Sequence, residues 1–162
     1  KYTVMIGNQL KGNGKIISIE PHPNNFEILK KNVELNKCEN VTLVNSACWN
    51  TKSTLKLFGH ESHPLLASAV KESKNFITVD SEPLDDILDR FGVKNVDLVK
   101  IDVEGAESKV VEGMKRVLET GKEKIIFEAW DSSFVEACRK VLEAYDYRIE
   151  QLSTMYWMGT HN

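Results

Sequence analysis

The chain has 162 residues, of which 41% are hydrophobic and 28% charged, and its formal net charge is −3. This length suits one domain with a single core, and the acidic balance disfavours nucleic acid, including an RNA substrate, or an anionic membrane surface as a partner. No apolar run approaches the ~20 residues of a membrane-spanning helix. The three cysteines, Cys38, Cys48 and Cys138, match no zinc-binding pattern, so we expect reduced thiols in a cytoplasmic protein.

The first part of the chain predicts alternating helices and strands. In order, these are helix Tyr2–Leu10, strand Lys15–Glu20, helix Asn25–Asn36 and strand Val41–Asn45. Both strands are rich in β-branched residues and almost continuously apolar, which is typical of parallel strands covered on both faces. The chain opens inside the first helix and without Met, so we interpret it as a piece of a longer protein.

A different pattern follows the second strand. Thr54–Phe58 and Phe76–Asp80 read as strands on either side of the polar segment Gly59–Ser73, which predicts a β excursion with a mobile tip. His60 and His63 lie in this segment, three residues apart and without a third ligand. Such a pair is a weak metal signal, and we expect no metal site.

The second half of the chain returns to alternating elements. In order, these are helix Leu84–Phe91, strand Val96–Asp102, helix Glu107–Leu118 (with Gly113 inside it) and strand Lys124–Ala129. A further helix opens at a capping box of Ser133 and Glu136, and Tyr147–Met158 predicts a closing antiparallel pair. The alternation predicts an α/β fold with a doubly wound, mainly parallel sheet and helices on both faces.

Acidic residues recur where the predicted core strands end. Glu20 ends the first strand, Asp102 ends the third, and the fourth carries Glu128. Ligands of open α/β sheets bind beyond the carboxyl ends of the strands, and a carboxylate there can accept hydrogen bonds from both hydroxyls of a ribose. Glu20 is therefore a candidate ribose ligand, although it could also be a solvated strand end or a helix cap. Asp102 and Glu104 could likewise be placed there because negative charge is stabilised at the N-terminus of a helix, here the helix that follows Gly105.

The glycine-rich phosphate fingerprint is not present in this chain. Gly7, Gly12 and Gly14 do not form GxGxxG, and no predicted strand precedes them. Spacing alone therefore does not establish a nucleotide site.

Five segments carry a family resemblance. In chain order these are IISIEPHPNNFEILKKNVELN, VTLVNSACWN, VDSEPLDDIL, VDLVKIDVEGAESKVVEGM and KIIFEAW. On these segments, which cover most of its length, the chain resembles the FkbM-type S-adenosylmethionine-dependent methyltransferases. The combination of EPxP with KIDVEGAE is the specific part of the resemblance.

The resemblance implies a class I methyltransferase fold, which is Rossmann-like and has a mainly parallel sheet with an antiparallel last strand, in one domain over residues 1–162. It implies S-adenosylmethionine as cofactor, with Glu20 on the ribose and Pro21 and His22 lining that site. It also implies that Ser46 and Ala47 pass near the adenine, and that Asp102–Glu104 faces the methionine moiety and the acceptor.

One departure from the family concerns the beginning of the chain. The family's first strand and its acidic, glycine-containing turn should stand directly before Lys1, and the sequence does not contain them. We therefore expect an N-terminally truncated domain whose sheet lacks a central strand and whose cofactor binding is weakened. An incomplete sheet also leaves an edge that invites pairing with a second copy.

Methyl transfer from a sulfonium is an in-line displacement, which requires positioning and, for a hydroxyl acceptor, a base. We predict O-methylation of a hydroxyl on a small molecule or glycan, with Asp102 as the first candidate base and Glu104 and Glu128 as the alternatives. Two other classes remain open. One is a methyltransferase-fold binding module without catalysis, which the missing turn favours. The other is a nicotinamide-dependent oxidoreductase, whose sheet also places an acid after the second strand.

Overall fold

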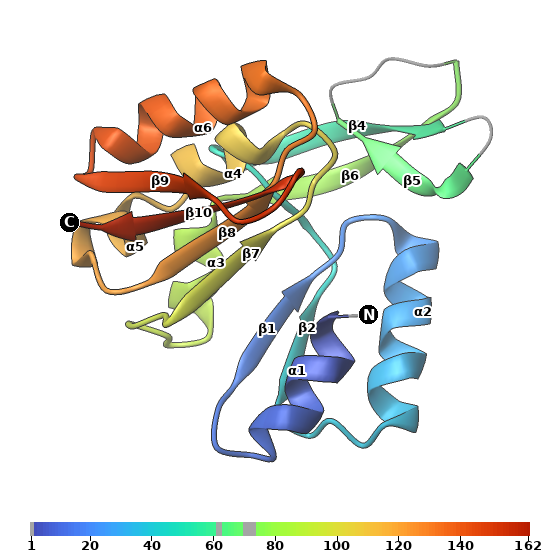
Figure 1. Ribbon diagram of the computed structural model, residues 1–162. Helices are drawn as coiled ribbons and strands as arrows, with labels where there is room; N and C mark the ends of the chain where they lie inside the picture. The colour runs from blue at the N-terminus through green and yellow to red at the C-terminus, as the bar shows by residue number, and fades with distance from the viewer. Residues whose placement is uncertain (1, 61–62, 70–73) are drawn as a thin grey trace. The chain divides into compact units, whose positions relative to one another are not determined.

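The computed structural model describes residues 2–60, 63–69 and 74–162. The chain divides into two compact units, Lys1–Ala47 and Cys48–Asn162 (Figure 1). The candidate site residues fall into both units, and each unit is described on its own below.

The first unit is a helix–strand–helix–strand run. It contains α1 (Tyr2–Leu10), β1 (Ile16–Ile19), α2 (Pro23–Leu35) and β2 (Val41–Val44). The two strands pair in parallel from Ile16 opposite Val41 to Ile19 opposite Val44, as the continuous apolar runs predict. Helix α2 begins two residues earlier than predicted because Pro23, whose fixed φ suits the first turn of a helix, opens it.

One four-stranded sheet of the second unit is mixed. Its strand order is β7 (Leu98–Ile101), β8 (Lys124–Glu128), β10 (Tyr156–His161) and β9 (Tyr147–Gln151). Strand β7 runs parallel to β8, whereas β10 runs antiparallel to both β8 and β9. The predicted antiparallel closing pair is therefore confirmed. Helix α6 (Ser132–Glu143) packs against β9 and against α4 (Glu107–Glu112) (Figure 1).

The other sheet of this region is the predicted β excursion. Its strands are β3 (Ala47–Cys48), β6 (Phe76–Glu82), β4 (Ser53–His60) and β5 (His63–Ser68), in that order. The antiparallel pairing of β4 with β6 confirms the two strands that the sequence predicted. Strand β5 lies in the polar segment and was not predicted. The mobile tip was predicted within Gly59–Ser73, and residues 61–62 and 70–73 of this segment lie outside the described residues.

The predicted helix Glu107–Leu118 is wrong, because the structure breaks it into two. Helix α4 ends at Glu112, and α5 runs from Lys115 to Thr120. The break lies at Gly113, where an added Cβ would stand 2.1 Å from the carbonyl oxygen of Trp49. Gly113 thus permits a close approach between this turn and the backbone after β3.

The prediction of a capping box at Ser133 is also wrong. The N-cap of α6 is Asp131, whose carboxylate accepts a hydrogen bond of 2.8 Å from the backbone N–H of Ser133. A hydrogen bond from the Ser133 hydroxyl, together with this backbone hydrogen bond, lowers the pKa of Asp131. Glu136 instead lies 3.5 Å from Arg139 on the exposed face of the helix.

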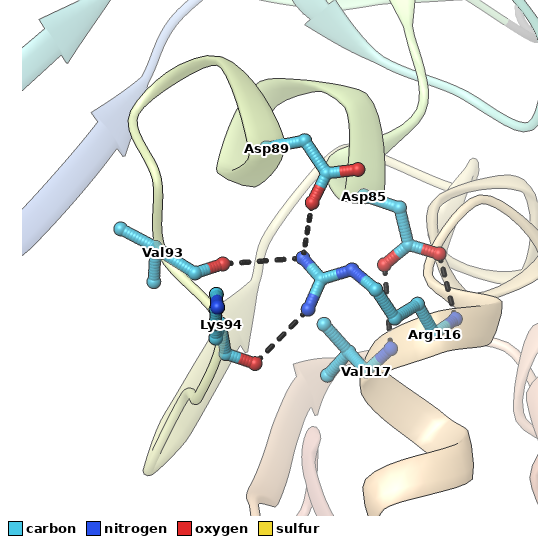
Figure 2. Close-up of polar contacts among 6 residues, drawn as sticks. All are labelled: Asp85, Asp89, Val93, Lys94, Arg116 and Val117. Atoms are coloured by element: carbon cyan, nitrogen blue, oxygen red, sulfur yellow. Dashed lines mark hydrogen bonds and ion pairs between the residues drawn. The ribbon is translucent and has the colours of Figure 1, made fainter.

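A polar cluster joins α5 to α3 (Leu84–Arg90) and to the loop before β7 (Figure 2). The Asp85 carboxylate accepts hydrogen bonds from the backbone N–H groups of Arg116 (2.7 Å) and Val117 (3.3 Å) in the first turn of α5. The Arg116 guanidinium pairs with Asp89 at 3.1 Å and donates to the carbonyl oxygens of Val93 and Lys94. The two Asp85 hydrogen bonds cap a helix whose own N-cap residue makes no side-chain cap, and the Arg116 contacts fix the helix to α3 and to the loop before β7.

Burial differs between the strands. Ile125 and Phe127 of β8 have no exposed surface, as expected for a strand covered on both faces. All four residues of β1 are only half-buried, so the same expectation is wrong for β1, which has one neighbouring strand among the described residues. Within the described part of the chain, no helix has both the length and the apolar character needed to cross a bilayer.

Candidate functional site

A fixed turn follows β1. The backbone N–H of Glu20 donates to the carbonyl oxygen of Val44 (3.0 Å), which continues the pairing of β1 with β2. The Glu20 side chain then folds back and accepts a hydrogen bond of 2.9 Å from the backbone N–H of His22. From the end of β2, Asn45 Nδ2 donates to the carbonyl oxygens of Glu20 (2.8 Å) and Pro21 (3.2 Å). Hydrogen bonds from residues that follow both strands therefore fix the acidic turn.

Sequence reasoning missed the role of Asn45. It noted Asn45 only as the end of the second strand. The sequence did offer a signal. Asn45 directly follows the strand that pairs in parallel with the strand before Glu20. Because the carboxyl ends of parallel strands lie at the same edge of a sheet, its amide can be expected near Glu20.

Burial dominates the electrostatics of Glu20. It raises the pKa of this half-buried carboxyl above its ordinary value of 4.5, and hydrogen bonds from the His22 backbone and from Asn25 only partly offset it. Among the described residues, no lysine or arginine pairs with Glu20. The Nδ1 atom of His22 is buried beside this turn and has no hydrogen-bond partner in the described part of the chain.

Ser46 and Ala47 follow Asn45 directly, and each is only 5% exposed. The Ser46 hydroxyl makes a long contact of 3.5 Å with the carbonyl oxygen of Ala47. The contact of these two residues with an adenine stays a prediction.

Asp102 and Glu128 lie at the same end of neighbouring strands. The parallel register of β7 and β8 ends with Ile101 opposite Phe127, and one acid follows on each strand. Asp102 is exposed and forms an ion pair of 3.4 Å with Lys100. The Lys100 ammonium also lies 5.3 Å from the ring centre of Tyr156, the residue opposite Glu128 on β10. This edge therefore combines two carboxylates, one ammonium and one aromatic ring.

Glu104 lies in an unusual turn between β7 and α4. Its φ is +56°, in the left-handed region, and that of Gly105 is +100°. The carbonyl oxygen of Glu104 accepts a hydrogen bond of 2.9 Å from the hydroxyl of Ser68, and Gly105 N–H donates to Glu107 Oε1 at 3.0 Å. The turn that carries Asp102 and Glu104 is thus held by side chains from two elements.

Glu107, the first residue of α4, contacts this turn and was not predicted as a site residue. It is 1% exposed, and its Oε2 atom has no hydrogen-bond partner among the described residues. Burial raises the pKa of its carboxyl, and the charge of Asp102 raises it further, against hydrogen bonds from backbone N–H groups. Burial and the charges of Glu107 and Glu112 also raise the pKa of the Cys138 thiol to about 12, so this thiol is not a reactive one.

The structure brings the predicted residues together in two groups. Glu20, Pro21 and His22 form one group with Asn45, and the other group is Asp102, Glu104 and Glu128 with Glu107. Within the described residues there is no cluster of three or more His, Cys, Asp or Glu side chains suited to a metal ion. The three cysteines are free.

With this geometry in place, comparisons with known proteins become informative. Residues 2–149 match the model of the methyltransferase FkbM domain. The chain is also 24% identical to the methyltransferase sdnD of Sordaria araneosa, over 74% of this chain and 58% of that protein.

Two solved structures share the fold. The crystal structure of methyltransferase FkbM from Methylobacillus flagellatus KT superposes with a TM-score of 0.62 at 18% identity, over 97% of this chain and 41% of that one. The precorrin-6y C5,15-methyltransferase of Geobacter metallireducens GS-15 gives a TM-score of 0.56 at 15% identity, over 93% of this chain and 69% of that one. These likenesses confirm an α/β fold of the class I methyltransferase type. The chain spans about half the length of sdnD and of the FkbM structure.

Proposed function

Because the chain belongs to the methyltransferase FkbM domain family, we propose that it uses S-adenosylmethionine to methylate a hydroxyl group of a small molecule or glycan. The observation that carries the proposal is the acidic turn after β1, which is fixed by hydrogen bonds from His22 and Asn45. A preorganised carboxylate at the carboxyl end of a parallel strand suits the two hydroxyls of a ribose.

The residues of the turn fit the cofactor. A half-buried carboxylate that has no lysine or arginine partner in the described part of the chain gains from hydrogen-bond donors, and two ribose hydroxyls supply them. The buried Nδ1 atom of His22 is a further polar group that a ligand would satisfy. In the proposal Glu20 holds the ribose, Pro21 and His22 line it, Ser46 and Ala47 flank the adenine, and Asp102 reaches the methionine end.

The cofactor supplies a methyl group on a positively charged sulfur. The protein has to hold the acceptor oxygen in line with that methyl group and take the proton that the hydroxyl loses. We assign the proton to the carboxylate of Asp102, which is exposed and close to Lys100 at the end of β7. Glu128, at the same strand edge, and Glu104, in the adjoining turn, are the alternatives.

Two wider aspects of the proposal go with this chemistry. We propose that both units act as one methyltransferase domain, since the family match runs through both of them. We place the reaction in the cytoplasm, because the cysteines are free and two of them are buried.

The family match favours methyl transfer over hydride transfer with a nicotinamide. A binding module without catalysis is the second candidate, and turnover distinguishes it.

The test is a calorimetric titration of the protein with S-adenosylhomocysteine, with NAD as the comparison ligand. We expect binding of the former alone, and the Glu20→Ala variant should bind at least about ten-fold more weakly, because hydrogen bonds to a charged group contribute about 1.5–3 kcal/mol. Glu27→Ala, on the exposed face of α2, is the matched control and should bind like the wild type. Binding of NAD alone, or of neither ligand by the folded protein, would contradict the proposal.

The same titration at lower pH tests the charge of Glu20. Because burial raises the pKa of this carboxyl above 4.5, it takes up a proton at a higher pH than an ordinary glutamate. Affinity in the wild type should therefore start to fall at a pH above 4.5, while Glu20→Gln should bind weakly at every pH and lack this dependence. For the free protein the sign is opposite. Between pH 4.5 and the raised pKa of the folded state, the folded protein binds more protons at Glu20 than the unfolded chain does. The free energy of unfolding should therefore fall as pH rises through this range.

A further inference from the structure

The turn between β7 and α4 adopts a conformation that its sequence does not favour by itself. Glu104 has φ +56° and Gly105 has φ +100°. Glycine adopts such angles freely, but a side-chain-bearing residue in the left-handed region is disfavoured by ~1–2 kcal/mol. The conformation therefore has to be stabilised by contacts from outside the turn.

Two side chains provide these contacts. From the excursion sheet, the hydroxyl of Ser68 on β5 donates to the carbonyl oxygen of Glu104 at 2.9 Å. From the start of α4, Glu107 Oε1 accepts from the N–H of Gly105 at 3.0 Å. The two hydrogen bonds hold the peptide group between Glu104 and Gly105 at both its oxygen and its nitrogen.

Both side chains are shielded from water. Ser68 is 8% exposed and Glu107 is 1% exposed. Burying a carboxyl with one oxygen unsatisfied is unfavourable, so Glu107 is not a residue that stability alone would place here. A hydrogen bond in such an environment is also directional, which suits a role in fixing one conformation.

We infer that Ser68 and Glu107 are positioning residues for methyl transfer: together they hold the Glu104–Gly105 peptide, and through it they orient the turn that carries the carboxylates of Asp102 and Glu104. The inference rests on the proposed function in so far as this turn belongs to the methyl-transfer site. It also gives β5, in the sheet β3-β6-β4-β5, a part in positioning the candidate base Asp102, because Ser68 is the last residue of β5.

Amide hydrogen exchange measures how readily the turn between β7 and α4 opens, and it does not require enzymatic activity. We expect Ser68→Ala to speed exchange of the amides of residues 103–107 by roughly five-fold, as the loss of one ordinary hydrogen bond would, and Glu107→Ala to act in the same direction. Ser68→Thr keeps the hydroxyl on a strand residue and should restore the wild-type rates. Ser81→Ala is the matched control, since Ser81 is a buried serine of the same sheet that donates to Ser53 instead.

Turnover then separates positioning from general stability. In Ser68→Ala, kcat should fall by about ten-fold, because small misplacements of reacting groups are costly, while affinity for S-adenosylhomocysteine stays within about two-fold of the wild type. Ser68→Thr should recover kcat. Unchanged exchange of residues 103–107 in Ser68→Ala, or an equal increase in Ser81→Ala, would overturn the inference. If exchange responds as expected but the wild-type protein binds no S-adenosylhomocysteine, the hold on the turn stands and the proposed function fails.

Discussion

Asp102 is the residue on which the proposed proton transfer depends. It is exposed and paired with Lys100 at 3.4 Å, and exposed ion pairs contribute only about 0–1 kcal/mol to folding. Asp102→Asn keeps the shape of the side chain and removes its basicity. We therefore expect stability close to the wild type and a fall in turnover of about 100-fold or more, measured as S-adenosylhomocysteine formed in the presence of a hydroxyl acceptor.

Asp97→Asn, an exposed aspartate just before β7, is the control for a general loss of negative charge. If Asp102→Asn retains full turnover, Asp102 is not the base. Glu128→Gln and Glu104→Gln would then be compared in the same assay, because these acids lie at the same strand edge and in the adjoining turn.

The candidate site residues differ in how far the sequence could predict them. Glu20 and Asp102 were found because each follows an apolar strand, so position and residue type point to the same edge. Asn45 acts through hydrogen bonds to the turn after a different strand, and the only sequence signal for that role is its position directly after β2. Glu107 accepts a hydrogen bond from the N–H of Gly105, two residues earlier, and this contact depends on a turn conformation that the sequence did not predict. Glu107 was also hidden by its place at the start of a helix, where an acid is ordinary.

Helix α5 depends on a cap that comes from another element. It has six residues, and its first turn receives hydrogen bonds from the Asp85 carboxylate on α3 (Figure 2). Loss of a helix cap costs about 0.5–2 kcal/mol. We expect Asp85→Ala to lower the free energy of unfolding by about 1–2 kcal/mol, measured by urea denaturation.

Asp86→Ala is the matched control for this helix. Asp86 is the next residue of α3, it is exposed, and its removal should change the unfolding free energy by no more than ~0.5 kcal/mol. Equal effects of the two substitutions would mean that Asp85 stabilises α3 through its charge and does not cap α5.

At the scale of elements, the sequence predicted the alternating strands and helices and the closing antiparallel pair. Two of the errors, the unbroken helix Glu107–Leu118 and the missed strand β5, share one physical setting, which is contact between distant segments. The periodicity of Glu107–Leu118 continues through Gly113, whereas the break there lies beside the carbonyl oxygen of Trp49, a residue more than 60 positions earlier in the chain, which periodicity does not predict. Strand β5 likewise exists through its pairing with β4, and the pattern of the segment Gly59–Ser73 does not predict it.

The molecule as a whole has an uneven distribution of buried apolar residues. The second unit contains the fully buried side chains Ile87, Met114, Ile125, Phe127 and Leu142. Among the described residues 2–47 of the first unit, the buried apolar residues are Val33, Cys38, Val44 and Ala47. Small units bury a smaller fraction of their surface and are correspondingly less stable.

This asymmetry predicts where the protein opens and how the cofactor changes it. Without ligand, the amides of β1 and β2 should exchange with solvent faster than those of β8 and β10. Saturating S-adenosylhomocysteine should slow exchange in β1 and β2, because a ligand that binds only the folded form stabilises the region that must be folded to bind it, and the Glu20 turn lies there. NAD at the same concentration should leave these rates unchanged. Equal exchange in both units without ligand would show that they open as one, and protection confined to β8 and β10 would place the ligand away from Glu20.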